Sequence, residues 1–147
     1  MIEVALGFDF GSRKIGIAVG RASTGNAEGI ATIPCNPKTT LWSAINELIE
    51  YWQPDTLVVG LPFALNGTES KTTGFARKFG KDLDLRFNLP VCFIDETLTT
   101  DYADAIIRES TKNGKQITSR RKSIRDKLAA ELILMTFLNE HKNAKTR

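Results

Sequence analysis

The sequence is short of the residues that usually bind transition metals or form disulfide bridges. Among its 147 residues are one histidine, His141 near the polar C-terminal end, and two cysteines, Cys35 and Cys92, which form no Cys-x-x-Cys motif. These few residues argue against a zinc site and against a disulfide framework. Because both cysteines lie in apolar, strand-like stretches, we expect two reduced thiols that pack as small core residues.

Long uncharged apolar runs are also missing. No segment approaches the ~18 apolar residues that a membrane-spanning helix requires. Near the N-terminus, Glu3, Asp9 and Arg13 interrupt any signal-peptide core. We therefore predict a cytoplasmic protein that does not associate with membranes.

A strong charge bias is absent as well. Lys and Arg number 20 against 17 Asp and Glu, which gives a net charge of +3. This mild excess is compatible with a nucleic-acid partner but does not establish one. The chain contains no repeat, low-complexity tract or linker, so we predict a single domain over residues 1–147 with a substantial core.

Two N-terminal segments alternate large and small residues with a period of two. Residues 5–10 and 15–20 therefore indicate two strands, and the four residues between them suit a hairpin connection. If the hairpin closes directly, one face carries only bulky apolar side chains, and a slip of one residue would mix the faces. The bulky pairs are Phe10 with Ile15, Phe8 with Ile17 and Leu6 with Val19; the opposite face pairs Asp9 with Gly16, Gly7 with Ala18 and Ala5 with Gly20.

The nearly bare face of this hairpin admits two interpretations. Glycine inside a strand is costly and often marks the close approach of a ligand or of another backbone. Asp9, which stands on this face, would then be a functional carboxylate. Alternatively, a helix packs on the bare face and Asp9 only caps it or forms a salt bridge.

The rest of the chain predicts three further strands and four helices. The strands are 29–35, 56–60 and 91–95; the helices are one that Thr39 or Thr40 caps and that ends near Trp52, one over 69–87, one from Thr99 or Thr100 to 109, and one over 123–139 with a frayed tail. Short connections join the early strands and helical crossovers join the later ones. This order predicts an α/β fold with a mixed five-stranded sheet, three antiparallel strands then two parallel, flanked by helices on both faces.

Three carboxylates converge in this predicted topology. Clefts in such sheets lie beyond the carboxyl ends of the parallel strands; Asp9 lies near the end of the first strand, and Glu96 follows the last. Asp126 falls on the apolar face of the final helix, where an unpartnered carboxylate would be costly. It also fits a capping box that begins at Ser123, and both roles can hold together. Asp95 more simply ends its strand.

Such a set of carboxylates suits a hard cation. Asp9, Glu96 and Asp126 would bind Mg²⁺ or Mn²⁺ through oxygen. Ions of this kind, commonly in pairs about 3.5–4 Å apart, activate water and stabilise the leaving oxygen in phosphodiester cleavage. Without a usable histidine or a serine or cysteine dyad, metal-assisted hydrolysis is the simplest chemistry for these residues.

The chain resembles the YqgF family, also called RuvX, over nearly its whole length. Four motifs in this order carry the resemblance: Phe8-Asp9-Phe10-Gly11 with Ile15–Gly20, Val58–Pro62 with Asn66-Gly67-Thr68, Asp95–Thr100, and Asp126 with Ala129-Ala130 and Ile133-Leu134. The resemblance implies a ribonuclease H-like fold and a nuclease that either resolves Holliday junctions or matures the 5′ end of pre-16S rRNA. By position, Asp9, Glu96 and Asp126 match the family's catalytic acids. The chain departs from the family at Thr97, where arginine is usual, and this departure could alter phosphate binding.

Basic residues near the acids would bind substrate phosphates, although each could equally be a solvated surface charge. The densest group lies in a polar, aperiodic loop that leads into Asp126, and we interpret it as a mobile phosphate clamp; it consists of Lys112, Lys115, Arg120, Arg121 and Lys122. The residues predicted to bind nucleic acid are Arg13, Lys14, Lys71, Arg77, Lys78, Arg120, Arg121 and Lys122.

The preferred function is therefore metal-dependent cleavage of structured RNA in ribosome maturation. Cleavage of branched DNA, as by a Holliday junction resolvase, is the alternative within the same class. A binding module without catalysis is the alternative of another class. An ATP-using fold of the actin type is disfavoured, because such proteins close two domains around a nucleotide. Phosphate contacts carry no base information, so the sequence leaves RNA or DNA open, as it does a monomer or a homodimer.

Overall fold

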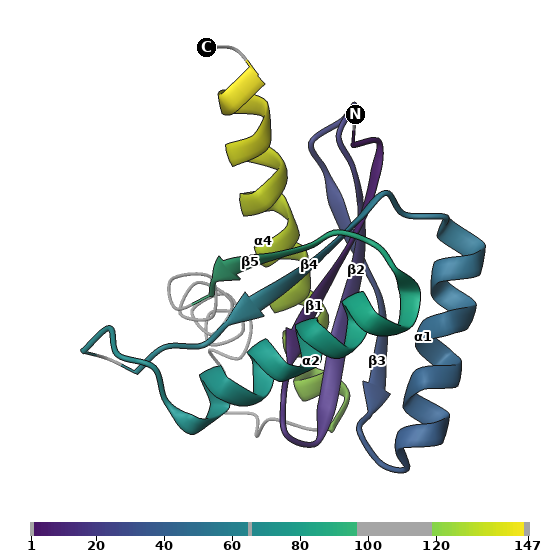
Figure 1. Cartoon of the computed structure of the whole chain (residues 1–147), viewed down its shortest axis with the longest axis vertical. Helices are drawn as coiled ribbons and strands as arrows, with labels where there is room; N and C mark the ends of the chain where they lie inside the picture. The colour runs from purple at the N-terminus through teal and green to yellow at the C-terminus, as the bar shows by residue number, and fades with distance from the viewer. Residues whose placement is uncertain (1, 65, 97–118, 146–147) are drawn as a thin grey trace.

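A mixed five-stranded sheet organises the protein (Figure 1). The computed structural model describes residues 2–64, 66–96 and 119–145, with the backbone alone for 119–126 and 142–145. The strand order is β3-β2-β1-β4-β5, in which β1 to β3 are antiparallel neighbours and β4 and β5 extend the sheet in parallel from β1. The predicted mixed sheet is confirmed. The strands are β1 Val4–Phe10, β2 Lys14–Arg21, β3 Ala27–Pro34, β4 Thr56–Leu61 and β5 Val91–Asp95.

Helices cover both faces of this sheet (Figure 1). Helices α1 (Lys38–Trp52) and α2 (Lys71–Phe87) pack on one face, and α4 (Ser119–Lys145) packs on the other. None of the helices in the described ranges combines the length and apolar character needed to cross a bilayer. The helix predicted to end at residue 109 lies outside the described residues.

The N-terminal hairpin forms in the predicted register. Phe10 lies opposite Ile15 at one end and Ala5 lies opposite Gly20 at the other. Its bulky side chains form the core beneath α1 and α2, where Phe8, Ile15 and Ile17 are fully buried.

Helix α4 packs on the bare face of the hairpin. For Gly7 and Gly20, the interpretation that a helix covers this face is therefore the correct one. A Cβ added to Gly7 would lie 3.0 Å from Cβ of Leu134, and one added to Gly20 would lie 2.8 Å from a methyl group of Leu138. Side chains at these positions would push α4 away from the sheet. The glycines therefore allow close helix packing, while Asp9 lies farther along the same face.

Both ends of the predicted last helix were wrong. Helix α4 begins at Ser119 and continues to Lys145, so Ser123 lies inside it and cannot open a capping box with Asp126. The arginines and lysine before Ser123 are good helix formers and extend the helix backwards. Arg120, Arg121 and Lys122 consequently belong to α4 and not to an aperiodic loop.

The predicted start of α1 was wrong by a smaller margin. The helix begins at Lys38, and Pro37 occupies the N-cap position without a side-chain hydrogen bond. Thr39 and Thr40 therefore fall inside the first turn and do not cap the helix. Helix α2, by contrast, is capped by Ser70, whose Oγ accepts a hydrogen bond from the backbone N–H of Thr73 at 3.3 Å.

The two cysteines are reduced, as predicted. Cys35 and Cys92 are free thiols and only half-buried. Partial burial raises the pKa of both groups above that of an exposed thiol. The Cys35 thiol donates a hydrogen bond to the carbonyl of Gly11 at 3.2 Å and so ties the β1–β2 turn to the end of β3.

Candidate functional site

Three parallel strands end together at one edge of the sheet and bring two acidic residues close. Asp9 is the penultimate residue of β1, and Glu96 follows β5 directly. Strand β4 lies between them and pairs in parallel with both. The backbone N–H of Glu96 donates to the carbonyl of Leu61 at 3.1 Å, which fixes Glu96 at the end of the sheet.

Gly60 leaves the space in which these two side chains meet. Strands β1 and β5 are two strand spacings apart, roughly 10 Å, because β4 separates them. A Cβ on Gly60 would lie 2.7 Å from Oε2 of Glu96, and it would also collide with Ile133 of α4. The carboxyl groups of Asp9 and Glu96 can therefore interact across the bare backbone of β4.

The electrostatics of Glu96 show that the two carboxyl groups interact. Glu96 is only 5% exposed, and burial raises its pKa from 4.5 to about 9, helped by the charge of Asp9, a hydrogen bond with Asp9 and the charge of Asp95. A buried carboxyl beside a second one keeps its proton, because two negative charges in low dielectric repel each other. The pair would therefore hold one proton between them near neutral pH.

A divalent cation is the natural replacement for that proton. Carboxylate oxygens are the donors that Mg²⁺ and Mn²⁺ prefer. Oε2 of Glu96 is buried and receives no hydrogen bond from the described residues, while the carboxyl group as a whole interacts with Asp9. Among the side chains that the structure describes, no three acidic, histidine or cysteine residues form a metal cluster. The Asp126 side chain lies outside that description.

The chain resembles proteins of one family along nearly its whole length. Residues 3–140 match the sequence model of "RuvX: Holliday junction resolvase". The chain belongs to the RuvX family. A relative from Neisseria gonorrhoeae is 42% identical over 134 residues, which are 91% of this chain and 86% of the relative. Another, from Pseudomonas paraeruginosa, is 42% identical over 142 residues, 97% and 96% of the two chains. Both carry the name "Putative pre-16S rRNA nuclease".

Solved structures with low sequence identity share the fold of this RuvX-family chain. RuvC of T. thermophilus, solved with a Holliday junction substrate, matches with a TM-score of 0.56 and 14% identity over 95% of this chain and 96% of that one. The fowlpox virus resolvase, solved with Holliday junction DNA, matches with a TM-score of 0.54 and 15% identity over 95% and 98% of the chains. These likenesses confirm the predicted ribonuclease H-like fold.

The structure separates the predicted basic residues into groups. Arg13 and Lys14 lie at the β1–β2 turn, a few residues beyond Asp9. Lys71, Arg77 and Lys78 lie on α2, which packs on the sheet face opposite to α4, so they do not join Asp9 on its face. Thr97 lies outside the described residues, as do lysines 112 and 115, and the side chains of Arg120–Lys122 are not described.

Arg77 is engaged by neighbouring side chains. Its guanidinium forms a salt bridge with Glu69 and lies 5.8 Å from the ring centre of Phe93. Lys78, one residue further along α2, is exposed. Of these two predicted phosphate ligands, Lys78 is therefore the more available.

Sequence reasoning missed Gly60 and Glu131. Gly60 was noted only as part of a family motif, although a glycine that closes a buried strand is itself a sign of close approach. Glu131 of α4 accepts a hydrogen bond from the backbone N–H of Gly29 at 2.7 Å and so fastens α4 to β3. No local pattern distinguishes Glu131 from a solvated helix carboxylate.

Proposed function

We propose that this chain is a metal-dependent endonuclease that hydrolyses phosphodiester bonds, with the 5′ end of pre-16S rRNA as its substrate. The observation that carries the proposal is the interacting pair of Asp9 and Glu96 where β1, β4 and β5 end. The names of the 42% identical relatives support the RNA substrate.

Asp9, Glu96 and Asp126 would hold Mg²⁺ or Mn²⁺ in this site. Such an ion, when bound, activates a water molecule and stabilises the leaving oxygen of the scissile phosphodiester. Asp9 and Glu96 would provide oxygen ligands once their shared proton is released, so binding of the cation should depend on pH. A divalent cation would compensate two buried carboxylates more fully than a single proton does.

The backbone of α4 supports the inclusion of Asp126. The carbonyl of Ala130 lies against Gly7, where a Cβ would come within 3.3 Å of it. Asp126 precedes Ala130 by about one helical turn. Leu138 lies against Gly20, opposite the start of β1, and Ala130 lies against Gly7, so α4 runs from the carboxyl end of β1 towards its start. This direction supports a place for Asp126 towards the end of the sheet where Asp9 lies.

Arg13 and Lys14 would bind the phosphates that flank the scissile bond. Both lie at the turn that follows Asp9, so a nucleic-acid strand that reaches the carboxylates would pass close to this turn. The cationic side chains attract phosphate without reading the base. Arg120, Arg121 and Lys122, at the start of α4, complete the proposed set on this side of the sheet, and Lys71, Arg77 and Lys78 would contact the substrate from α2.

Holliday junction DNA is the second candidate substrate, favoured by the family description. A decisive experiment compares a labelled pre-16S rRNA fragment with a four-way DNA junction, at the same Mn²⁺ and salt concentrations. We expect faster cleavage of the rRNA fragment. Faster cleavage of the junction would instead assign the protein to DNA recombination or repair.

The catalytic assignment is tested by Asp9→Asn. This variant keeps the size of the side chain and removes its negative charge, so we expect cleavage to be lost and nucleic-acid binding to persist. The matched control is Glu47→Gln, which neutralises an exposed carboxylate on α1, away from the site. If the unmutated protein cleaves neither substrate but binds them, the protein is a binding module without catalysis.

A further inference from the structure

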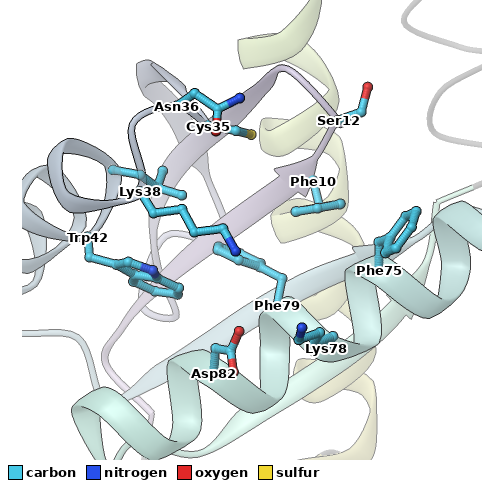
Figure 2. A pocket seen from close by; sticks show the side chains of 11 residues that line it. Phe10, Ser12, Cys35, Asn36, Lys38, Trp42, Phe75, Lys78, Phe79 and Asp82 are labelled. Carbon is cyan, nitrogen blue, oxygen red and sulfur yellow. The ribbon is translucent and has the colours of Figure 1, made fainter.

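An aromatic groove lies on the sheet face opposite to the carboxylate pair, at the same end of β1 (Figure 2). Its volume is about 290 Å³, close to the lower end of the roughly 300–1,000 Å³ that ligand pockets occupy. Phe10 borders it from the end of β1 and Ser12 from the β1–β2 turn, while α1 and α2 form its two walls. The groove therefore suits one flat ring system.

The aromatic floor of this groove is preformed. Trp42 of α1 stacks on Phe79 of α2, with ring centres 5.6 Å apart and planes inclined by 22°, and Phe10 lies 5.3 Å from the same Phe79 ring. The guanidinium of Arg86 covers Trp42 at 4.2 Å. These contacts fix the floor, so a ligand would lose little free energy in ordering it.

One aromatic ring of the groove is left accessible. Phe75 of α2 is 58% exposed and stands at the rim of the groove (Figure 2). An exposed ring beside an apolar floor provides a surface on which a second flat ring can stack.

The charges around the groove indicate which ring system it accepts. Lys38 extends from α1 across the groove, and Lys78 borders it from α2 (Figure 2). Two ammonium groups beside an aromatic surface suit a base that carries phosphates on its backbone. Asp82, also in the lining, offers acceptor oxygens to the amino group of such a base.

We propose that this groove binds one unpaired base of the polynucleotide whose phosphodiester lies at Asp9 and Glu96. This inference rests on the proposed function and narrows its substrate. Phe10 directly follows Asp9, so a nucleic-acid strand that passes over the β1–β2 turn can reach both the carboxylate pair and the groove. A base within a duplex has both faces covered by its neighbours and cannot enter. The groove therefore selects nucleic acid with a single-stranded segment beside the cleavage site.

The test measures binding of two RNA hairpins in EDTA, so that no metal-dependent cleavage occurs. One hairpin is blunt and the other carries a single-stranded 5′ overhang with the fluorescent base 2-aminopurine. We expect tighter binding of the overhang hairpin and quenching of its fluorescence by stacking. Phe75→Ala should weaken binding of the overhang hairpin by about 5- to 150-fold, the range for loss of one stacked base.

Two further variants separate stacking from folding defects. Phe75→Tyr keeps an aromatic ring and should keep the preference for the overhang. Leu85→Ala removes another exposed apolar side chain of α2, 72% exposed and outside the groove, and should bind like the unmutated protein. Equal binding of both hairpins, or equal effects of Phe75→Ala and Leu85→Ala, would overturn the proposal.

Two more measurements complete the test. Free UMP or AMP should compete only at much higher concentration than the overhang, and equal competition would assign the groove to a free nucleotide instead. Cleavage of pre-16S rRNA is measured separately. If the protein cleaves pre-16S rRNA but its binding does not depend on Phe75, only the proposal of base binding in the groove is overturned. If a base stacks in the groove but the protein cleaves nothing, base binding is supported and the proposed nuclease activity is refuted.

Discussion

Replacement of Glu96 by glutamine should stabilise the metal-free protein increasingly as pH rises. The pKa of Glu96 in the folded protein is about 9, compared with an ordinary value of 4.5. Between these two values the folded protein holds a proton that the unfolded chain has released. The stability that this proton contributes is complete below the lower pKa and is lost as pH rises through the upper one.

The size of the effect follows from the linkage between proton binding and folding. While the folded protein holds one proton more than the unfolded chain, its free energy of unfolding falls by about 3 kcal/mol for a rise of two pH units. Glutamine cannot titrate, so Glu96→Gln escapes this loss. The difference in unfolding free energy between the variant and the unmutated protein should therefore grow by about 3 kcal/mol from about pH 5.5 to about pH 7.5.

Urea denaturation in EDTA at several pH values measures this difference directly. Glu47→Gln, which alters an exposed carboxylate on α1, serves as the control and should follow the pH dependence of the unmutated protein. Saturating Mn²⁺ should flatten the pH dependence of the unmutated protein, since the cation replaces the proton. If the Glu96→Gln and unmutated curves run parallel in EDTA, Glu96 is charged in the folded protein and the argument from burial fails.

Three further substitutions test the packing around the site. Gly60→Ala should destabilise the protein by about 1–3 kcal/mol in urea and slow cleavage, because the added methyl group collides with Ile133; unchanged stability would show that α4 can move aside. Glu131→Ala should cost about 1.5–3 kcal/mol through loss of the hydrogen bond to Gly29, with a smaller cost for Glu131→Gln; equal costs would contradict a role for the charged acceptor. Phe79→Ala should cost about 3–5 kcal/mol in the same assay, because that ring contacts three other aromatic rings; a loss below about 1 kcal/mol would mean that the cluster repacks.

The sheet could be predicted from the sequence because its strands carry strong local patterns. Alternation of residue size over the first hairpin leaves one register that buries every large side chain, and this register is the observed one. The continuous apolar run of β4 likewise marks a strand buried within the sheet. The similar run of β5 also forms a strand, but that strand lies at the edge of the sheet and its residues are only partly buried or exposed. These patterns depend on neighbours along the chain and across one short turn.

Helix ends were less predictable, because competing signals occupy the same residues. Ser123 and Asp126 have the spacing of a capping box, yet the residues before them also favour a helix, and α4 extends back to Ser119. Similarly, two threonines offered caps for α1, although the helix begins after Pro37. Propensity decides such cases only together with tertiary packing.

Some features of the candidate site could likewise be predicted from the sequence, and others could not. The proximity of Asp9 and Glu96 follows from topology alone, since parallel strands end at one edge of the sheet. The retained proton of Glu96 does not, because it depends on how deeply the side chain is buried beneath α4. The aromatic groove was also beyond sequence reasoning, because the residues that line it come from three separate segments.

The glycines beneath α4 set how high the helix sits above the strands. At Gly7, Gly20, Gly29 and Gly60 an added Cβ would press on α4, over a row that spans four of the five strands. A methyl group added at any of these positions would push α4 away from the sheet at that point. Because a helix is stiff, the displacement would tilt α4 along its whole length, so a substitution far from the acidic residues can open the site. Mutations that impair the enzyme should therefore be found along the sheet as well as at its catalytic edge.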